Sequence, residues 1–307
     1  MKVLITGAAG FIGSNLAKSH LKEGDQVIGI DNLCTGTTRN LEALDEMEFL
    51  NSDLMDSRKI LPKSVDLIYH FASPASPEKY MAQALNTMNV NTVGTRMLLE
   101  YSLEVGARLI FASTSEIYGD PLENPQKEEY WGNVNPIGPR SVYDEAKRFG
   151  ETFVAHFQRE LEANAGIIRI FNTYGPNMDP YDGRVVSNFI RQAILGEPLT
   201  IYGSGNQTRS FCYIDDLLAG IRKMGESDIR GPINLGNPEE RTLLDLANLV
   251  LEVTNRDSTL EFMELPEDDP KQRRPDITKA KNLLGWEPKV DIKTGIQKTA
   301  DWISKVL

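Results

Sequence analysis

The chain has 307 residues, 40% of them hydrophobic, so it is long enough to bury one large core or two closely packed ones. Its formal net charge of −11 at pH 7 argues against nucleic acid as the main partner, because phosphate backbones are bound by basic surfaces. Cys34 and Cys212 are too few for a disulfide framework or a zinc site of the usual spacing, and we expect a cytoplasmic protein.

The N-terminal half of the chain alternates short apolar runs with helical patterns. Residues 2–6 predict the first strand, and 7–22 predict a glycine-containing turn followed by an amphipathic helix. Because this strand begins at Lys2, we expect no leader or anchor before the fold, and no later stretch is apolar for long enough to span a bilayer. Further elements are expected as strands at 26–30, 47–50, 65–69, 108–112 and 166–170, and as long helices at about 80–105 and 142–162. This alternation is typical of a doubly wound parallel sheet, the Rossmann arrangement.

Beyond Asn172 the pattern changes. Short strands are expected at 199–202 and 232–235, and helices near 185–195, 215–226, 242–254 and 291–305. We therefore predict an α/β protein with a nucleotide-binding Rossmann domain over residues 1–171 and a smaller C-terminal α/β substrate domain over 172–307. The boundary is expected to be interwoven, with part of 211–240 returning to the first domain.

A glycine-rich turn joins the first strand to its helix. Glycines at this place allow a tight turn and let backbone N–H groups approach a pyrophosphate at the helix N-terminus. The alternative is a tight turn without a ligand. The residues expected to bind the cofactor here are Gly7, Gly10, Phe11, Ile12 and Gly13.

Asp31 ends the second strand, where a carboxylate accepts hydrogen bonds from an adenosine ribose and repels a 2′-phosphate. This favours NAD over NADP, although Arg39 lies nearby and Asp31 with Asn32 is also compatible with a turn or helix cap. Asp53 is compatible with either an adenine contact or a helix cap. The expected cofactor contacts also include Asn32, Asp53, Leu54, Ala72 and Ser73.

Two side chains in the helix expected at 142–162 suggest a base. Tyr143 and Lys147 are four residues apart, so on a helix they lie on one face, where the ammonium lowers the pKa of the phenol. Oxidation of an alcohol needs such a base. The alternative for Tyr143 and Lys147 is an ordinary pair on the helix surface. Glu116, upstream, is a further candidate for the site, and the alternative for it is a structural carboxylate bonded to a loop N–H.

The glycine spacing, Asp31, the Tyr-x-x-x-Lys pair and Thr114 together resemble the extended short-chain dehydrogenase/reductase family over essentially the whole chain. Longer strings resemble its UDP-glucuronate decarboxylase branch, the UDP-xylose synthases. These strings are 113–121, 130–140, 183–189, 235–240, and 268–270 continuing through 273–276. The eukaryotic members carry a membrane anchor, and we expect none in this protein.

The resemblance implies that Tyr143 takes the proton from the C4 hydroxyl of UDP-glucuronate while hydride passes to NAD⁺. Lys147 would hold the nicotinamide ribose, and Thr114 would hydrogen-bond the sugar oxygen. A C4 ketone is β to the C6 carboxylate, so loss of carbon dioxide leaves a resonance-stabilised enolate. Protonation at C5 and return of the hydride would give UDP-xylose, with NAD unchanged overall and kept bound.

The residues at 115 and 116 distinguish this branch from its relatives. Sugar-nucleotide 4,6-dehydratases carry an Asp-Glu pair there, and 4-epimerases usually have a small or hydroxyl residue in place of Glu116, whereas this chain has Ser115 and Glu116. A lone carboxylate suits decarboxylation, either by disfavouring the substrate carboxylate or by positioning a proton or water for C5. A 4-epimerase, a 4,6-dehydratase and a non-catalytic NAD-binding scaffold remain the alternatives.

The resemblance also implies a UDP-sugar site. Arg273 is assigned to the catalytic and substrate-binding residues, with Arg274 as the alternative, and guanidinium groups suit diphosphate oxygens. Tyr80 is expected near the sugar carboxylate, and Tyr202 near uracil. For each of these residues a plain structural role is the competing interpretation. The full set of expected substrate contacts is Tyr80, Asn172, Arg184, Asn188, Tyr202, Arg209 and Arg273.

No metal site is expected, because the three histidines show no ligand spacing, and the pair Asp268–Asp269 is compatible with a solvated loop. The long helices are expected to form a homodimer through a four-helix bundle, as the resemblance implies.

Overall fold

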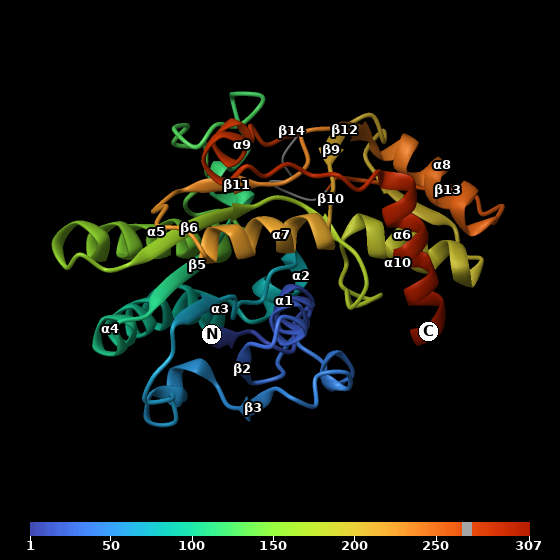
Figure 1. Ribbon diagram of the computed structural model, residues 1–307. Helices are drawn as coiled ribbons and strands as arrows, with labels where there is room; N and C mark the ends of the chain where they lie inside the picture. The colour runs from blue at the N-terminus through green and yellow to red at the C-terminus, as the bar shows by residue number, and fades with distance from the viewer. Residues whose placement is uncertain (266–271) are drawn as a thin grey trace.

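The computed structural model describes residues 1–265 and 272–307, and it is built on a seven-stranded parallel sheet (Figure 1). The strand order is β11-β6-β5-β4-β1-β2-β3, and every neighbouring pair is parallel. Its strands are β1 (Lys2–Thr6), β2 (Gln26–Asp31), β3 (Glu48–Asn51), β4 (Leu67–His70), β5 (Arg108–Thr114), β6 (Ala165–Ile170) and β11 (Ile233–Leu235). The predicted doubly wound α/β fold is confirmed.

Helices cover both faces of this sheet, as the alternating side chains of its strands require. Val3 and Ile5 belong to the apolar cluster that includes the helices of one face, α1 (Phe11–Lys22) and α7 (Ile214–Gly225). Leu4, between them, belongs to the cluster on the other face, with α4 (Thr95–Val105) and α5 (Ser141–Glu160). The strands are therefore buried on both sides, which explains why they read as continuous apolar runs.

The helix expected at about 80–105 is wrong as a single element. The structure has four successive elements there: α2 (Pro77–Ala82), α3 (Ala84–Asn89), a π-helical turn η3 (Val90–Gly94) and α4. The break falls at Gln83, whose φ of −121° and ψ of 40° are not helical. In the π-helical turn, the Val90 carbonyl lies 3.2 Å from Nε2 of the buried His70, so a tertiary contact replaces regular helix geometry.

The C-terminal part contains three helices that pack on one another: α6 (Val185–Leu195), α8 (Leu243–Thr254) and α10 (Ile292–Val306). A parallel pair of strands lies beside them, β8 (Leu199–Tyr202) and β13 (Leu260–Met263). The remaining strands are β7 (Thr173–Tyr174) paired with β10 (Cys212–Tyr213), and a small sheet of β12 (Glu240–Thr242), β9 (Thr208–Ser210) and β14 (Gln272–Arg273). One more helix, α9 (Thr278–Leu284), precedes α10.

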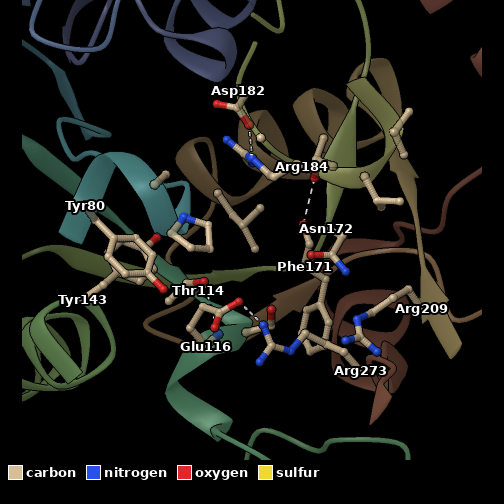
Figure 2. A pocket seen from close by; sticks show the side chains of 18 of the residues that line it. Tyr80, Thr114, Glu116, Tyr143, Phe171, Asn172, Asp182, Arg184, Arg209 and Arg273 are labelled. Carbon is tan, nitrogen blue, oxygen red and sulfur yellow. Dashed lines mark hydrogen bonds and ion pairs between the residues drawn. The ribbon is translucent and has the colours of Figure 1, made fainter. Parts of the chain in front are cut away.

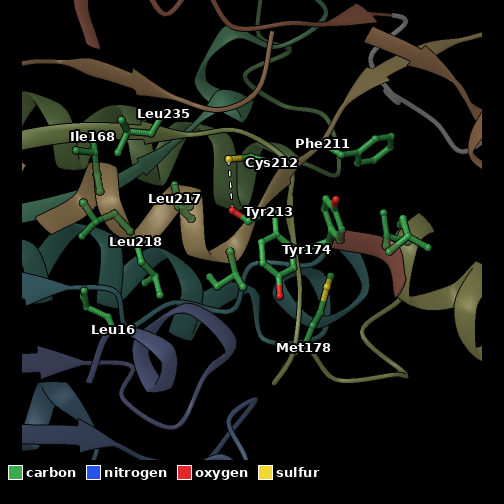
Figure 3. Packing of buried hydrophobic residues seen from close by; sticks show 14 of the residues in the cluster. Leu16, Ile168, Tyr174, Met178, Phe211, Cys212, Tyr213, Leu217, Leu218 and Leu235 are labelled. Atoms are coloured by element: carbon green, nitrogen blue, oxygen red, sulfur yellow. Dashed lines mark hydrogen bonds between the residues drawn. The ribbon is translucent and has the colours of Figure 1, made fainter. Parts of the chain in front are cut away.

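Residues from both parts of the chain share one apolar core. Figure 3 shows Leu16 of α1 and Ile168 of β6 in the same cluster as Leu217, Leu218 and Leu235. The strand expected at 232–235 is found as β11, but it extends the main sheet beside β6. The chain thus leaves the main sheet after β6 and comes back to it through α7 and β11.

Three 3₁₀ turns complete the description: η1 (Thr38–Leu41), η2 (Leu54–Lys59) and η4 (Ser115–Tyr118), the last directly after β5. Within the described ranges, no helix combines the length and apolar character needed to cross a membrane. Asp268, Asp269 and Pro270, which contribute to the family resemblance, lie outside the described residues.

Candidate active site

A cavity of about 510 Å³ lies where the carboxyl ends of β5 and β6 meet the C-terminal part of the chain. Open parallel sheets commonly bind ligands at this edge. All five residues predicted to be catalytic line this cavity, although they come from positions up to 159 residues apart in the sequence: Thr114, Glu116, Tyr143, Lys147 and Arg273. Figure 2 shows Thr114, Glu116, Tyr143 and Arg273 around the cavity.

Tyr143 and Lys147 occupy successive turns of α5, and both are buried. The Lys147 ammonium donates a hydrogen bond of 2.7 Å to the carbonyl of Ala112 in β5 and lies 5.7 Å from the centre of the Tyr143 ring. Burial lowers the pKa of Lys147 to about 7, against the opposing effect of the Glu151 carboxylate. Lys147 is therefore a cation whose charge is sensitive to its surroundings.

The pKa of Tyr143 departs from the sequence-based expectation. Burial raises the pKa of the phenol, although a hydrogen bond with the Thr114 side chain acts to lower it. The predicted lowering by Lys147 does not dominate, because the Lys147 ammonium is directed to the Ala112 carbonyl. Tyr80 of α2 stacks on Tyr143 with ring centres 4.8 Å apart and planes 4° apart, which adds to this burial.

Glu116, in η4, is held between two guanidinium groups. Its Oε2 accepts a hydrogen bond of 2.5 Å from Arg140, and its Oε1 accepts one from Arg273. Burial acts to raise the pKa of Glu116, but the Arg273 and Arg140 charges outweigh it and hold the pKa at about 2. The alternative of a carboxylate bonded to a loop N–H is wrong, because these arginines supply the donors.

Two residues near Glu116 were not among the site residues predicted from the sequence. Arg140 precedes α5 and lines the cavity, and Asp144 follows Tyr143 on that helix. Burial and the nearby Glu116 charge raise the pKa of Asp144 to about 8, so this carboxyl is neutral at pH 7. Arg140 and Asp144 are four residues apart and lie on either side of Tyr143 in the sequence. This spacing is the sequence signal that could have identified them.

The residues predicted to bind substrate also line this cavity of about 510 Å³, which is the larger of two described cavities. Arg184 donates to the Asp182 carboxylate, and Asn188 donates to the Gly183 carbonyl over 3.1 Å. Arg273 lines the cavity, whereas Arg274 is paired with Glu240 and does not line it. The cavity-lining members of this set are Tyr80, Asn172, Arg184, Asn188, Tyr202, Arg209 and Arg273.

A second cavity of about 110 Å³ adjoins the glycine turn. A side chain at Gly7 would place its Cβ 2.7 Å from the Phe71 carbonyl oxygen, so only glycine fits this approach. Gly10 is the N-cap residue of α1 and provides no side-chain cap. The first backbone N–H groups of α1 are therefore available for an anion. Eight predicted cofactor contacts line this cavity: Gly7, Gly10, Asp31, Asn32, Asp53, Leu54, Ala72 and Ser73.

The remaining predicted cofactor contacts lie elsewhere. Ile12 lines the larger cavity, as do Tyr143 and Lys147, and Phe11 and Gly13 line neither cavity. Gly13 instead lets α1 approach the turn, because its Cβ would come within 2.0 Å of the Gly7 carbonyl oxygen. Asp53 caps η2, because its side chain accepts a hydrogen bond from the backbone N–H of Met55, so the interpretation as a helix cap is confirmed. Asp53 also lines the smaller cavity.

Both carboxylate oxygens of Asp31, which lines the smaller cavity, accept backbone hydrogen bonds. Its Oδ2 accepts a hydrogen bond of 3.0 Å from the backbone N–H of Ala9, and its Oδ1 accepts one of 2.7 Å from Leu33. The carboxylate is thereby fixed at the end of β2, beside the glycine turn. A Rossmann sheet with this turn and with Thr114, Tyr143 and Lys147 at its edge defines an enzyme that uses a dinucleotide to oxidise an alcohol.

The chain belongs to the NAD dependent epimerase/dehydratase family, whose model matches residues 3–236. Among curated proteins, it is 48% identical over 309 residues to UDP-glucuronic acid decarboxylase 1 of Danio rerio, covering 100% of this chain and 73% of that protein. It is 49% identical over 300 residues to UDP-glucuronic acid decarboxylase 5 of Arabidopsis thaliana, covering 96% of this chain and 87% of the relative. The predicted resemblance is confirmed.

Solved structures agree with the fold. UDP-glucuronic acid 4-epimerase from Bacillus cereus, solved with UDP-glucuronic acid and NAD, has a TM-score of 0.89 at 30% identity and covers each chain completely. UDP-glucose 4-epimerase from Thermotoga maritima, solved with UDP-glucose, has a TM-score of 0.91 at 30% identity, over 100% of this chain and 99% of the other. The prediction of NAD as cofactor is confirmed.

Proposed function

We propose that the protein is an NAD-dependent UDP-glucuronate decarboxylase that forms UDP-xylose. The observation that carries this proposal is Glu116, held by Arg140 and Arg273 in the same cavity as Tyr143. Decarboxylases of this name share 47–49% identity with the chain over nearly its whole length. The 4-epimerases share its fold at about 30% identity, so they support the alternative activity less well.

The reaction begins at the C4 hydroxyl of the sugar, whose proton Tyr143 accepts. Thr114 hydrogen-bonds this region and Lys147 supplies the positive charge that stabilises the phenolate. Hydride acceptance and return at C4 is the chemistry that bound NAD supplies. After carbon dioxide has left, C5 of the enolate takes a proton from water. Tyr143 then gives its proton back to the C4 oxygen, so the protein groups finish the cycle unchanged.

The charges beside Tyr143 suit a substrate that carries a carboxylate. Arg140 and Arg273 provide two positive charges, Glu116 provides one negative charge, and Asp144 is neutral at pH 7. This cluster has a surplus positive charge that a substrate carboxylate balances.

We propose that residues 1–171 form the NAD-binding domain and that 172–307 form the UDP-sugar domain, with α7 and β11 packed on the first. Arg184 and Arg209 are suited to the diphosphate, because guanidinium groups match phosphate oxygens. Asn172 faces the sugar, and Asn188 and Tyr202 flank the uracil. The position of all five along one cavity supports this assignment.

The direct test is to incubate the purified protein with UDP-glucuronate and NAD⁺ and to measure carbon dioxide and UDP-xylose. UDP-galacturonate with the carboxylate retained would establish the epimerase, and NAD binding without any change of the sugar nucleotide would establish the scaffold. Tyr143→Phe should abolish oxidation, whereas the exposed Tyr181→Phe should not. Glu116→Gln should impair decarboxylation more than NAD binding, and normal UDP-xylose output from it would refute its role.

We also propose that the protein is a homodimer that pairs through α3, η3 and α5. Large apolar side chains are exposed on these elements: Leu85 by 73%, and Val93 and Phe149 by 50% each. Leu85→Glu should convert the dimer to a monomer in analytical ultracentrifugation. Leu122→Glu, in the loop after η4 and exposed by 81%, is the matched control, and an unchanged mass for Leu85→Glu would contradict this interface.

A cytoplasmic location is proposed as well, and it is supported by the free thiols of Cys34 and Cys212. Fractionation of the source cells tests it.

A further inference from the structure

A buried polar network lies behind the candidate active site, centred on Glu151 of α5. Its Oε1 accepts hydrogen bonds from Ser113 Oγ at 2.5 Å and from Arg169 Nε at 2.9 Å, and its Oε2 accepts one from Arg169 at 2.7 Å. Ser113 and Arg169 are paired residues of β5 and β6, and both are buried. Glu151 and Arg169 line neither cavity, so substrate binding does not account for them.

Glu151 continues the row of reactive side chains on α5. It lies one turn beyond Lys147 and two turns beyond Tyr143, so all three share a helix face. Lys147 donates to the Ala112 carbonyl and Glu151 accepts from the Ser113 hydroxyl, the next residue of β5. Two side chains of opposite charge thereby attach α5 to the end of the strand that carries Thr114.

The charges that face Lys147 come from few groups. Burial lowers its pKa to about 7, and the Glu151 carboxylate is the charge that opposes this effect. Two further titratable groups near Lys147 in the described ranges are Tyr143, and His70 of β4, whose own pKa is lowered to about 3 by burial and by the Lys147 charge. His70 is therefore neutral at pH 7.

The network reaches further through Arg169. This guanidinium donates to the Tyr118 hydroxyl at 2.9 Å and to the Glu128 carbonyl at 2.8 Å, and Tyr118 donates to Oδ1 of Asn234 at 2.9 Å. Tyr118 ends η4, the turn that carries Glu116, and Asn234 lies in β11. Glu151 is thus linked through Arg169 and Tyr118 to η4, which carries Glu116, and to β11.

We propose that Glu151 is a positioning residue for the reaction, which holds Lys147 as a cation and fixes the distance between α5 and the catalytic end of β5. The kinetic part of this proposal rests on the proposed function. Without the Glu151 charge, Lys147 loses the carboxylate that opposes the effect of burial. Lys147 then releases its proton at a lower pH, and less of the protein carries the cation that Tyr143 needs.

The test compares Glu151→Gln with the wild type over pH 4 to 9. For two charges one helical turn apart on α5, the alkaline limb of the decarboxylation rate should move to lower pH by roughly one to two units. At pH 8 the kcat should fall at least about tenfold, while the KM for UDP-glucuronate changes little. Glu145→Gln is the matched control, because Glu145 lies on the same helix with a side chain that is 41% exposed and should leave the profile unchanged.

A second variant separates charge from folding. Glu151→Gln combined with Arg169→Met leaves no unpaired cation, so it should regain the thermal stability lost in Glu151→Gln but keep the displaced alkaline limb. Recovery of the wild-type profile in this double variant would overturn the proposal, because the defect would then come from the unpaired Arg169.

A measurement without substrate keeps the proposal independent of the proposed function. The titration of Lys147, followed by NMR in protein labelled at the lysine ε-carbons and assigned with Lys147→Met, should move to lower pH in Glu151→Gln, with or without NAD⁺. An unchanged midpoint would refute the positioning role. If the midpoint moves but the wild type leaves UDP-glucuronate unaltered, the proposed function fails and the role of Glu151 stands.

Discussion

Asp144 provides a test of the electrostatics of the site, because its replacement should make the protein more stable. The ordinary pKa of an aspartate is 3.8, and burial with the nearby Glu116 charge raises that of Asp144 to about 8. The unfolded chain therefore ionises this group above pH 3.8, while the folded protein keeps it protonated. Stability is lost progressively as the pH rises from about 4 to about 8. Asparagine has the shape of the protonated acid and carries no charge at any pH.

The size of the effect follows from the interval between the two pKa values. At pH 7 the folded protein still holds the Asp144 proton, although this pH lies about three units above the unfolded pKa of 3.8. At 1.36 kcal/mol per unit, this lowers the free energy of unfolding by about 4 kcal/mol. The Asp144 carboxyl also has one oxygen without a hydrogen-bond partner in the described part of the chain, and asparagine keeps that defect. We therefore expect Asp144→Asn to raise the free energy of unfolding at pH 7 by about 2 to 4 kcal/mol.

The assay is urea unfolding of the wild type and Asp144→Asn between pH 4 and 9. The gain should be near zero at pH 4, rise with pH and level off above pH 8. The exposed Asp301→Asn is the control and should show no such trend. A gain for Asp144→Asn that is the same at every pH, or a loss of stability at pH 7, would refute the assignment of a neutral Asp144 beside an ionised Glu116.

Three further predictions concern the two cavities. Arg140→Met removes one of the cations that keep Glu116 ionised, so the acid limb of the decarboxylation profile should move to higher pH by about two units; an unmoved limb would assign that task to Arg273 alone. Gly13→Ala places a Cβ 2.0 Å from the Gly7 carbonyl oxygen and should reduce NAD binding at least about tenfold in calorimetry, so near-normal affinity would show that the turn yields. Asp31→Ser should narrow the preference for NAD over NADP about tenfold or more in competition binding, and an unchanged ratio would place the discrimination elsewhere.

The sequence was most informative where the relevant contacts are local. Tyr143 and Lys147 share a helix face because of their spacing, and the glycine turn follows directly from strand β1. The apolar runs identified every strand of the main sheet within a few residues. The helix expected at about 80–105 failed at Gln83, since a single nonhelical residue leaves no trace in an apolar pattern that continues on both sides.

Contacts between distant segments were not accessible in this way. Glu116 and Arg273 are 157 residues apart, and nothing in either segment indicates that their side chains form an ion pair. The pKa of Tyr143 depends on burial beneath Tyr80, which comes from another helix, so spacing alone gave the wrong direction. The resemblance pointed to Arg273, which lines the larger cavity, but it supplied neither Arg140 nor Glu151.

The return of the chain to the main sheet has a consequence for folding during synthesis. β11 is the edge strand beside β6, yet 62 residues separate the end of β6 from its start. On the ribosome, β6 therefore emerges with one side of its backbone unpaired, and the edge is closed only after Leu235 has been made. Exposed strand edges promote association between chains, so the interval between the synthesis of these strands is the stage at which this protein is most prone to aggregate.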